Sequence, residues 1–281
     1  MTLSDFIKQF RARFFSRNMP QAQGTKERQN PVEAMMNNVT VVGFSDIGLV
    51  RANNQDVFGI FPELNLAAVA DGMGGRPAGE VASKMAMDSI SEFLVRAKES
   101  DGVPRADLPL LEEAISYANK KVFDASEANA LYRGMGTTVV AMLVHKEEVL
   151  IGFAGDSRAY LYRGGVLTQM TEDHSVTNEY IRAGMITREE AKRHPLKHVI
   201  SRGVGVEPTV SPETFKKSAQ AGDIFLLCTD GLSNMLDEDD ICSILNKNQG
   251  NLSLAISSLI ESAKGAGGRD NITVILVRYD K

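Results

Sequence analysis

The sequence LAAVADG at residues 66–72 joins a run of five apolar residues to an aspartate, Asp71, that stands next to a glycine. The same pattern returns in IGFAGD at residues 151–156 and in IFLLCTDG at residues 224–231. A mirror image, GRDNITVILV, occupies residues 268–277, where Asp270 precedes the apolar run. Short runs rich in Val, Ile, Leu and Phe that are bounded by Gly or Asp are typical of buried β-strands. The pattern therefore predicts four strands that each carry an aspartate at one end.

A single aspartate of this kind needs no function, because Asp and Gly are favoured turn residues. Four aspartates at the ends of neighbouring buried strands would repel one another and lose hydration unless a cation lay between them. Oxygen ligands suit hard ions such as Mg²⁺ or Mn²⁺, and the sequence has no His/Cys spacing typical of zinc. We therefore expect an acidic metal site of the kind used in phosphoryl chemistry.

A polar segment, residues 45–56, follows another strand-like run and ends in Asp56. It contains Arg51, whose planar guanidinium could bind a phosphate through parallel hydrogen bonds. For Arg51 taken alone, a surface salt bridge is the simpler alternative. Asp56 is expected to join the metal site directly or through water, because Mg²⁺-type ions keep several of their waters.

The grouping of the remaining patterns predicts the fold class. The expected strands are residues 39–44, 57–61, 66–70, 137–144, 149–154, 159–163, 224–229 and 272–278. Helical spacing of apolar residues predicts helices at about 79–97, 108–128, 175–183, 187–193, 238–245 and 252–263. Strands 149–154 and 159–163 are expected to form a hairpin or a close pair. Strands that arrive in groups favour an α+β fold with mostly antiparallel sheets.

The composition excludes several classes of protein. The 281 residues are 43% hydrophobic and 24% charged, as in an ordinary soluble globular protein. The net charge of -5 argues against a nucleic-acid partner, since such proteins usually carry a basic surplus. No run of 18 apolar residues predicts a membrane span, no signal-peptide pattern opens the chain, and two cysteines give no disulfide framework. We expect a cytoplasmic protein, and a monomer.

Residues 1–38 differ from the rest and are expected to form an N-terminal extension. Residues 3–14 place Leu, Ile and Phe at helical spacing beside basic residues, and residues 18–38 have the composition of a linker. The extension carries six Lys and Arg against three Asp and Glu, a charge of +3 that leaves -8 for residues 39–281. A basic amphipathic helix in residues 1–18 could dock on an anionic membrane surface or on a partner. Packing on its own domain is the alternative.

Seven short motifs occur in a fixed order along residues 39–278. They are Arg51 with Asn54-Gln55-Asp56, Asp71-Gly72-Met73-Gly74-Gly75, Gly136-Thr137-Thr138, Gly155-Asp156-Ser157-Arg158, Thr171-Glu172-Asp173-His174-Ser175, Thr229-Asp230-Gly231 and Asp270-Asn271. This ordered set resembles the PPM (type 2C) family of Ser/Thr protein phosphatases, in its bacterial branch. Each motif alone is weak, whereas seven in the correct order are specific.

The resemblance implies a four-layer αββα sandwich, two packed antiparallel sheets flanked by helix pairs, for residues 39–281. A flap would be inserted at about residues 175–215. The implied activity is the hydrolysis of phosphoserine and phosphothreonine in proteins by a metal-activated water. Phosphoprotein substrates, and a bacterial Ser/Thr kinase that the enzyme opposes, are the implied partners.

The resemblance also implies a role for each site residue, with two Mn²⁺ or Mg²⁺ ions and a weaker third one. Asp71 would bridge the first two ions, and the carbonyl of Gly72 would complete the first. The roles of the others are as follows: Asp230 and Asp270 hold the second ion, Asp156 shares the third with Asp230, Asp56 binds a metal-coordinated water, and Arg51 holds the substrate phosphate.

Two positions depart from the family pattern. Gln55 stands where many relatives carry glutamate, and Met73 stands where eukaryotic relatives often carry a histidine considered a general acid. Methionine cannot donate a proton, so the leaving group would take its proton from water or from another residue. His174 lies between Asp173 and Ser175, but three adjacent residues cannot converge as a catalytic triad does, and a structural role is expected.

Two other functions remain open at this point. A catalytically silent phosphoprotein-binding module would be expected to lack metal ligands, and none of the motif aspartates is missing. A two-metal nuclease would use similar carboxylates but would need a basic groove, which a body charge of -8 does not favour.

Overall fold

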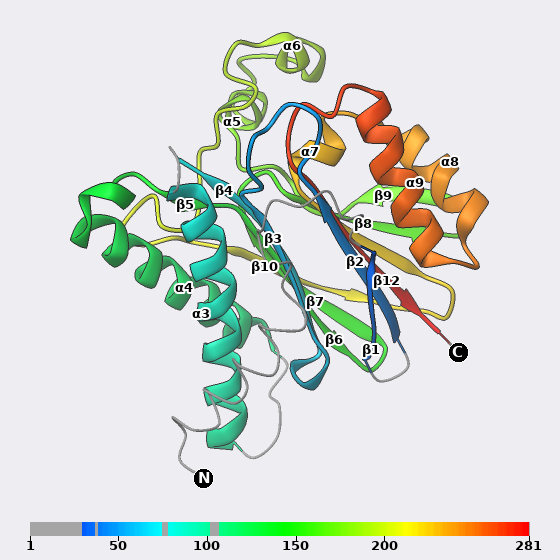
Figure 1. Ribbon diagram of the computed structural model, residues 1–281, viewed down its shortest axis with the longest axis horizontal. Coiled ribbons are helices and arrows are strands. Elements are labelled where there is room, and N and C mark those ends of the chain that lie inside the picture. Colours follow the sequence, from blue (N-terminus) through cyan, green and yellow to red (C-terminus); the bar gives the residue numbers. More distant parts are fainter. Residues whose placement is uncertain (1–29, 37–38, 75–77, 102–106, 281) are drawn as a thin grey trace.

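Two antiparallel sheets lie face to face at the centre of the molecule (Figure 1). The computed structural model describes residues 30–36, 39–74, 78–101 and 107–280. In this part of the chain the first sheet has the order β1 (Val32–Met36), β2 (Val39–Asp46), β12 (Ile272–Tyr279), β11 (Ile224–Cys228), β8 (Arg158–Arg163) and β9 (Val166–Gln169). The second has the order β10 (Glu213–Ser218), β7 (Glu148–Ala154), β6 (Val139–His145), β4 (Leu66–Met73) and β3 (Asp56–Phe61), with β5 (Gly136–Thr137) paired to the end of β4.

The strands read as continuous apolar runs because both faces of each sheet are covered. In β12, Ile275 and Val277 point into the core between the two sheets. Their neighbours Val274 and Leu276 point the other way, toward a second core beneath helices. Side chains of successive strand residues alternate between the faces, so each sheet contributes to two cores.

Paired helices cover the outer face of each sheet. α3 (Ala78–Asp101) and α4 (Leu108–Ala128) pack on the second sheet, and α8 (Glu238–Asn248) and α9 (Leu252–Gly265) pack on the first (Figure 1). α4 begins at a cap, since the Asp107 side chain accepts a hydrogen bond of 2.9 Å from the backbone N–H of Leu110. The four layers confirm the αββα sandwich that the resemblance implied.

The structure corrects two predictions about the strands. Val32–Met36, assigned to the linker, form β1 and pair with β2, so the predicted linker is wrong for these residues. The pattern was missed because this edge strand alternates buried and exposed residues. The predicted hairpin is also wrong: β7 pairs within the second sheet and β8 within the first. Residues 155–157 carry the chain from one sheet to the other.

The segment between β9 and β10 contains the predicted flap. It holds two short helices, α5 (Val176–Arg182) and α6 (Arg188–Arg193), which rise above one end of the sandwich (Figure 1). Residues 213–215, placed at the end of the predicted flap, belong to β10. No helix in the described residues is both long and apolar enough to cross a membrane. Residues 1–18 lie outside the described part of the chain, so the predicted N-terminal helix stays a prediction.

Candidate metal centre

Five predicted aspartates come together at one end of the sandwich, because the strands that carry them all begin or end there. Asp56 opens β3 and stands directly opposite Asp71 of β4. Asp156 lies in the crossing from β7 to β8, Asp230 is the first residue of the short helix α7 (Asp230–Ser233), and Asp270 lies just before β12. Asp56 is buried, with 6% of its surface exposed, whereas the other four are partly exposed. The buried Asp56 thus forms the floor of the cluster, and the four partly exposed aspartates form its accessible rim.

Burial and the charges of neighbouring carboxylates raise the pKa of four of these aspartates. Burial is the largest cause in each case, and it raises the pKa of Asp56 and of Asp156 to about 7. The pKa of Asp71 is raised well above its ordinary value by burial and by the charges of Asp56 and Asp230. Burial and the charge of Asp270 raise the pKa of Asp230, while a hydrogen bond with Asp71 opposes the rise. Without a cation, these carboxylates are held together at a cost in free energy.

The cluster fits a hard divalent ion. Its donors are all carboxylate and carbonyl oxygens, as Mg²⁺ and Mn²⁺ prefer. Two oxygens, Oδ1 of Asp56 and Oδ1 of Asp230, are buried without a hydrogen-bond partner in the described part of the chain. Such orphaned acceptors are rare unless an ion or water serves them.

The side chains are not yet arranged as a coordination shell. Among the described residues, no group of three or more His, Cys, Asp and Glu side chains is placed to hold an ion as it stands. One reason is on the rim, where Oδ2 of Asp270 pairs with Nη2 of Arg51 at 2.5 Å. An ion bound by Asp270 would compete with Arg51 for this carboxylate.

Hydroxyl groups from the opposite sheet hold Asp56 in place. Oδ2 of Asp56 accepts hydrogen bonds from Thr273 at 2.7 Å and from Thr229 at 2.8 Å. Since Thr273 has only one hydroxyl proton, Ser45 must be the donor in the 2.7 Å bond between Ser45 and Thr273. Asn54 donates to Ser45 and accepts from the backbone N–H of Asp56, which closes a ring. Oδ2 of Asp56 thereby has two hydrogen-bond donors, whereas Oδ1 has no partner among the described residues.

Thr273→Val is expected to weaken Mn²⁺ binding about 10- to 100-fold, the range typical of lost partners of metal-site groups. Valine keeps the shape of threonine but removes one of the two hydroxyl donors to Asp56 and leaves the Ser45 hydroxyl proton without an acceptor. Isothermal titration of the metal-free protein with Mn²⁺ measures the change. Thr273→Ser, which restores the hydroxyl, is the matched control, and equal affinity in the valine and serine variants would contradict the role of this hydroxyl.

Two glycines allow the backbone to approach the cluster. A Cβ on Gly72 would lie 2.1 Å from the carbonyl oxygen of Gly79, and one on Gly231 would lie 1.8 Å from that of Asn271. Both distances are far below contact, so a side chain at either position would displace the neighbouring backbone. The position of Gly72 next to Asp71 is compatible with its predicted carbonyl ligand, which stays a prediction.

Arg51 stands on the rim, within a loop that hydrogen bonds from the side chain of Asn271 hold in place. The side chain of Arg51 is half exposed. The side chain of Asn271 accepts from the backbone N–H of Gln55 at 2.8 Å and donates to the carbonyls of Ile47 and Asn53 at 3.0 Å each. Asn271 thus holds both ends of the loop, which fixes the backbone position from which the Arg51 side chain projects.

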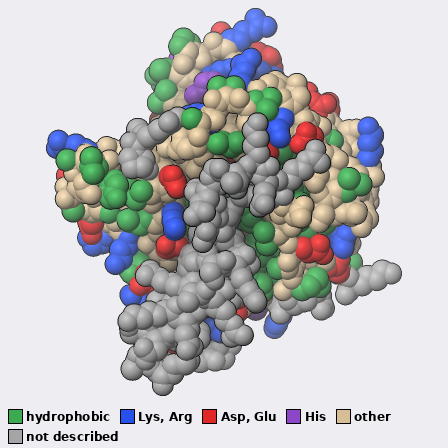
Figure 2. All heavy atoms as spheres, viewed as in Figure 1, with side chains coloured by type: hydrophobic (Ala, Val, Ile, Leu, Met, Phe, Trp, Pro, Cys, Tyr) green, Lys and Arg blue, Asp and Glu red, His purple; other side chains and the backbone are tan. Residues whose placement is uncertain are grey.

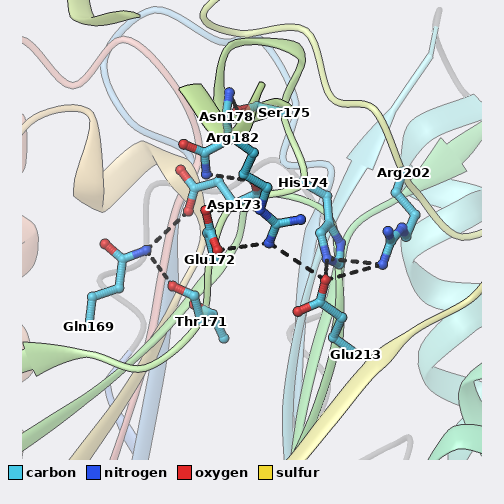
Figure 3. Close-up of polar contacts among 10 residues, drawn as sticks. All are labelled: Gln169, Thr171, Glu172, Asp173, His174, Ser175, Asn178, Arg182, Arg202 and Glu213. Atoms are coloured by element: carbon cyan, nitrogen blue, oxygen red, sulfur yellow. Dashed lines mark hydrogen bonds and ion pairs between the residues drawn. The ribbon is translucent and has the colours of Figure 1, made fainter. Parts of the chain in front are cut away.

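His174 is a structural residue at the root of the flap (Figure 3). It is buried, stacks on Phe153 with ring centroids 4.8 Å apart, and accepts a hydrogen bond from the backbone N–H of Gly155 through Nδ1. Its Nε2 lies 3.1 Å from Oε1 of Glu213. Burial and the charge of Arg202 lower the pKa of His174, which favours the neutral ring. Because Nδ1 accepts, the proton lies on Nε2 and is directed to Glu213, so Nη1 of Arg202, 3.2 Å from Nε2, cannot also donate to that nitrogen. The predicted structural role agrees with these contacts.

A second set of hydrogen bonds joins the start of the flap, at Asp173, to the loop that carries Asp156. Arg158 donates two hydrogen bonds to the carboxylate of Asp173, at 2.8 and 2.7 Å. The hydroxyl of Ser157 meets that of Thr138 at 2.6 Å, and Thr138 in turn accepts from the backbone N–H of Asp71. The backbone positions of Asp71 and Asp156 are therefore linked through hydroxyl groups.

The hydroxyl residues that orient the carboxylates had no predicted role, although three of them lie in the quoted motifs: Ser45, Thr138, Ser157, Thr229 and Thr273. Two of these carried a usable signal. Thr229 directly precedes Asp230, and Thr273 lies three residues after Asp270, both at strand ends. Hydroxyl residues at otherwise apolar strand positions that flank predicted ligands are therefore candidates for groups that orient those ligands.

Metal-free protein is expected to lose stability as the pH rises from about 5 to 8. A carboxyl whose pKa is higher in the folded state stabilises the fold below its unfolded pKa, near 4, and this contribution is lost through its folded pKa of about 7. Mn²⁺ at about 1,000 times its Kd should raise the Tm by about 10 °C. At one fixed Mn²⁺ concentration the gain should be larger at pH 8 than at pH 6, because protons compete with the ion and raise its Kd at the lower pH. Differential scanning fluorimetry with and without Mn²⁺ tests both trends, and a gain that shrinks at higher pH would contradict them.

The chain is similar to known protein phosphatases. The family model described as protein phosphatase 2C matches residues 50–255. The serine/threonine phosphatase stp of Listeria monocytogenes is 41% identical over 241 residues, which cover 84% of this chain and 94% of the relative.

Solved structures agree with the sequence match. The crystal structure of the Mycobacterium tuberculosis serine/threonine phosphatase PstP/Ppp is 36% identical, with a TM-score of 0.78 over 86% of this chain and 99% of the other. A second structure, the PstP catalytic domain in complex with two manganese ions, is 35% identical with a TM-score of 0.75, over 86% of this chain and 99% of that one. The chain therefore belongs to the protein phosphatase 2C family.

Proposed function

We propose that this protein is a metal-dependent phosphatase that hydrolyses phosphoserine and phosphothreonine in proteins. The observation that carries the proposal is the cluster of Asp56, Asp71, Asp156, Asp230 and Asp270 beside the half-exposed Arg51. Two of its buried oxygens, on Asp56 and Asp230, have no hydrogen-bond partner among the described residues. The family match and the relatives' names support the same reaction.

The proposed ligand roles follow the family pattern. Asp71 and the Gly72 carbonyl, together with Asp230 and Asp270, would hold the two main ions, and Asp156 would contribute to a weaker third one. Mn²⁺ or Mg²⁺ is the proposed metal, and the two manganese ions of the PstP structure support this choice. When bound, such ions lower the pKa of a coordinated water so that hydroxide becomes available near neutral pH.

The protein's own groups bind and orient the reactants. Arg51 binds phosphoryl oxygens and stabilises the charge that develops on them. The free Oδ1 of Asp56, fixed by the bonds to Oδ2, accepts a hydrogen bond from water at the floor of the site. Met73 offers no proton, and the partly exposed rim leaves the leaving oxygen open to protonation by solvent.

A direct assay tests the proposal against the alternatives. Metal-free protein is supplied with Mn²⁺ and incubated with p-nitrophenyl phosphate or a phosphothreonine peptide, and released phosphate is measured. Hydrolysis that requires Mn²⁺ and stops with EDTA is expected. No hydrolysis with saturable phosphopeptide binding would instead establish a silent binding module, and hydrolysis of nucleic acid alone would establish a nuclease.

The proposal extends to the cellular setting. We place the protein in the reducing cytoplasm, and the free thiols of Cys228 and Cys242 support this compartment. We further propose that it is a monomer and that it opposes a Ser/Thr kinase. Residues 1–18 are proposed to dock on an anionic membrane surface or on a partner, since they combine basic and apolar residues at helical spacing. Unchanged co-sedimentation with anionic vesicles after deletion of residues 1–18 would refute the membrane role.

A further inference from the structure

An apolar turn stands exposed beside the phosphate-binding arginine. Between β2 and Arg51, the side chains of Ile47, Leu49 and Val50 are 40%, 63% and 68% exposed. Single exposed apolar residues are common on protein surfaces, whereas three within four residues at the edge of a reaction site form a patch. Hydrophobic side chains reach the surface at this end of the sandwich, between the flap and α9 (Figure 2).

The exposure does not come from a loose loop. Gly48 adopts a φ of +77° and donates to the side chain of Asp46, and the backbone N–H of Leu49 donates to the carbonyl of Gly268 at 2.7 Å. Lys264 holds Asp46 at 3.1 Å from the other side. A side chain at Gly48 would lie 2.1 Å from the carbonyl oxygen of Asp270, so the turn packs tightly on the backbone of the site. The apolar side chains are thus presented by a fixed backbone.

The position of the turn fixes what it can contact. Val50 is bonded to Arg51, and Arg51 reaches the carboxylate of Asp270 within the cluster. An extended peptide advances about 3.3 to 3.6 Å per residue. With its phosphate on Arg51, a substrate would bring the residues one to three positions from the phosphorylated one over Leu49 and Val50. An apolar side chain there would be removed from water together with them, which favours binding.

We propose that Ile47, Leu49 and Val50 form a docking surface for an apolar residue that lies one to three positions from the phosphoserine or phosphothreonine of the substrate. This inference rests on the proposed phosphatase function and adds a sequence preference to it. The preorganised turn means that little conformational entropy is lost on contact. Charged or polar flanking residues would gain no partner from these three side chains.

Phosphothreonine peptides that differ only at the flanking positions, with Leu in one set and Gln in the other, test the proposal. The ratio of kcat/KM for the Leu and Gln peptides is measured within each protein, so changes in overall activity cancel. For the wild type we expect a ratio of about ten, the discrimination typical of an apolar contact. In a Leu49→Gln, Val50→Thr double variant the ratio should fall to about one.

Matched exposed residues elsewhere provide the control. Leu254 on α9 and Val166 on β9 are 52% and 62% exposed, and Leu254→Gln with Val166→Thr should keep the wild-type ratio. Phosphopeptide hydrolysis without a preference for Leu in the wild type, or a preference that survives in the double variant, would overturn the docking surface alone. Absence of any Mn²⁺-dependent hydrolysis by the wild type would overturn the phosphatase function and the docking surface with it.

Discussion

Asp71→Asn is expected to reduce Mn²⁺-dependent hydrolysis of a phosphothreonine peptide by about 10³-fold or more. Asp71 is the proposed bridging ligand, and an amide in its place removes the negative charge that two cations would share. Loss of several kcal/mol of transition-state stabilisation corresponds to such a factor, because each ~1.4 kcal/mol changes the rate tenfold. Initial rates at saturating Mn²⁺ and a Mn²⁺ titration by calorimetry measure the effect on catalysis and on binding.

The same substitution should stabilise the metal-free protein. Burial and the charges of Asp56 and Asp230 raise the pKa of Asp71, so the ionised carboxylate is unfavourable in the folded state without a cation. A neutral amide relieves that repulsion. We expect the Tm of metal-free Asp71→Asn to exceed that of metal-free wild type at pH 8, with the difference shrinking toward pH 5. Loss of activity together with a lower Tm would indicate misfolding and would not support the ligand role.

An exposed aspartate serves as the control for this experiment. Asp124 on α4 pairs with Lys120 on the surface, at 2.9 Å, with more than half of both side chains exposed. Asp124→Asn should change neither the rate nor the metal affinity, since exposed pairs of this kind contribute little. Full activity in Asp71→Asn would refute the metal assignment.

The core strands were predictable because each is buried on both faces and reads as a continuous apolar run. β4 and β11 illustrate this, and the helix α4 was predicted with its observed bounds because its apolar residues recur at helical spacing. The edge strands were not predictable in the same way. β10 reads ETFKKS and β9 reads VLTQ, and neither carries an apolar run. β10 pairs with β7, which lies far earlier in the chain, whereas β9 pairs with its neighbour β8 across the turn at Gly164 and Gly165. In both cases the partner strand and the backbone hydrogen bonds decide the pairing, because propensity alone is weak at a sheet edge.

The site was predictable as a set of charges but not as a geometry. Asp-Gly pairs at strand ends revealed the carboxylates, whereas the link from Thr273 to Asp56 joins positions 217 residues apart in two different sheets. The wrong hairpin has the same origin. Adjacent apolar runs such as β7 and β8 can pair with each other or face each other across a core, and only the long-range partners decide between these arrangements.

Arg51→Ala is expected to weaken competitive inhibition by inorganic phosphate about 100-fold, because a hydrogen-bonded ion pair is lost. It should lower kcat/KM for phosphopeptides by at least the same factor, since the guanidinium also neutralises charge in the transition state. Arg51→Lys should recover only part of the loss, because an ammonium lacks the planar fork. Inhibition constants for phosphate at saturating Mn²⁺ provide the measurement.

The pairing of Arg51 with Asp270 gives this variant a second, opposite effect. The two side chains pair at 2.5 Å, so Arg51 would compete with the metal for a carboxylate that is its proposed ligand. Removing Arg51 should therefore leave Mn²⁺ affinity unchanged or increase it, while phosphate binding falls. A general disturbance of the rim would weaken both, and a fall in Mn²⁺ affinity would contradict the competition. If the two effects separate as expected, metal binding releases Arg51 from Asp270, and the phosphate site becomes available only once the ions are in place.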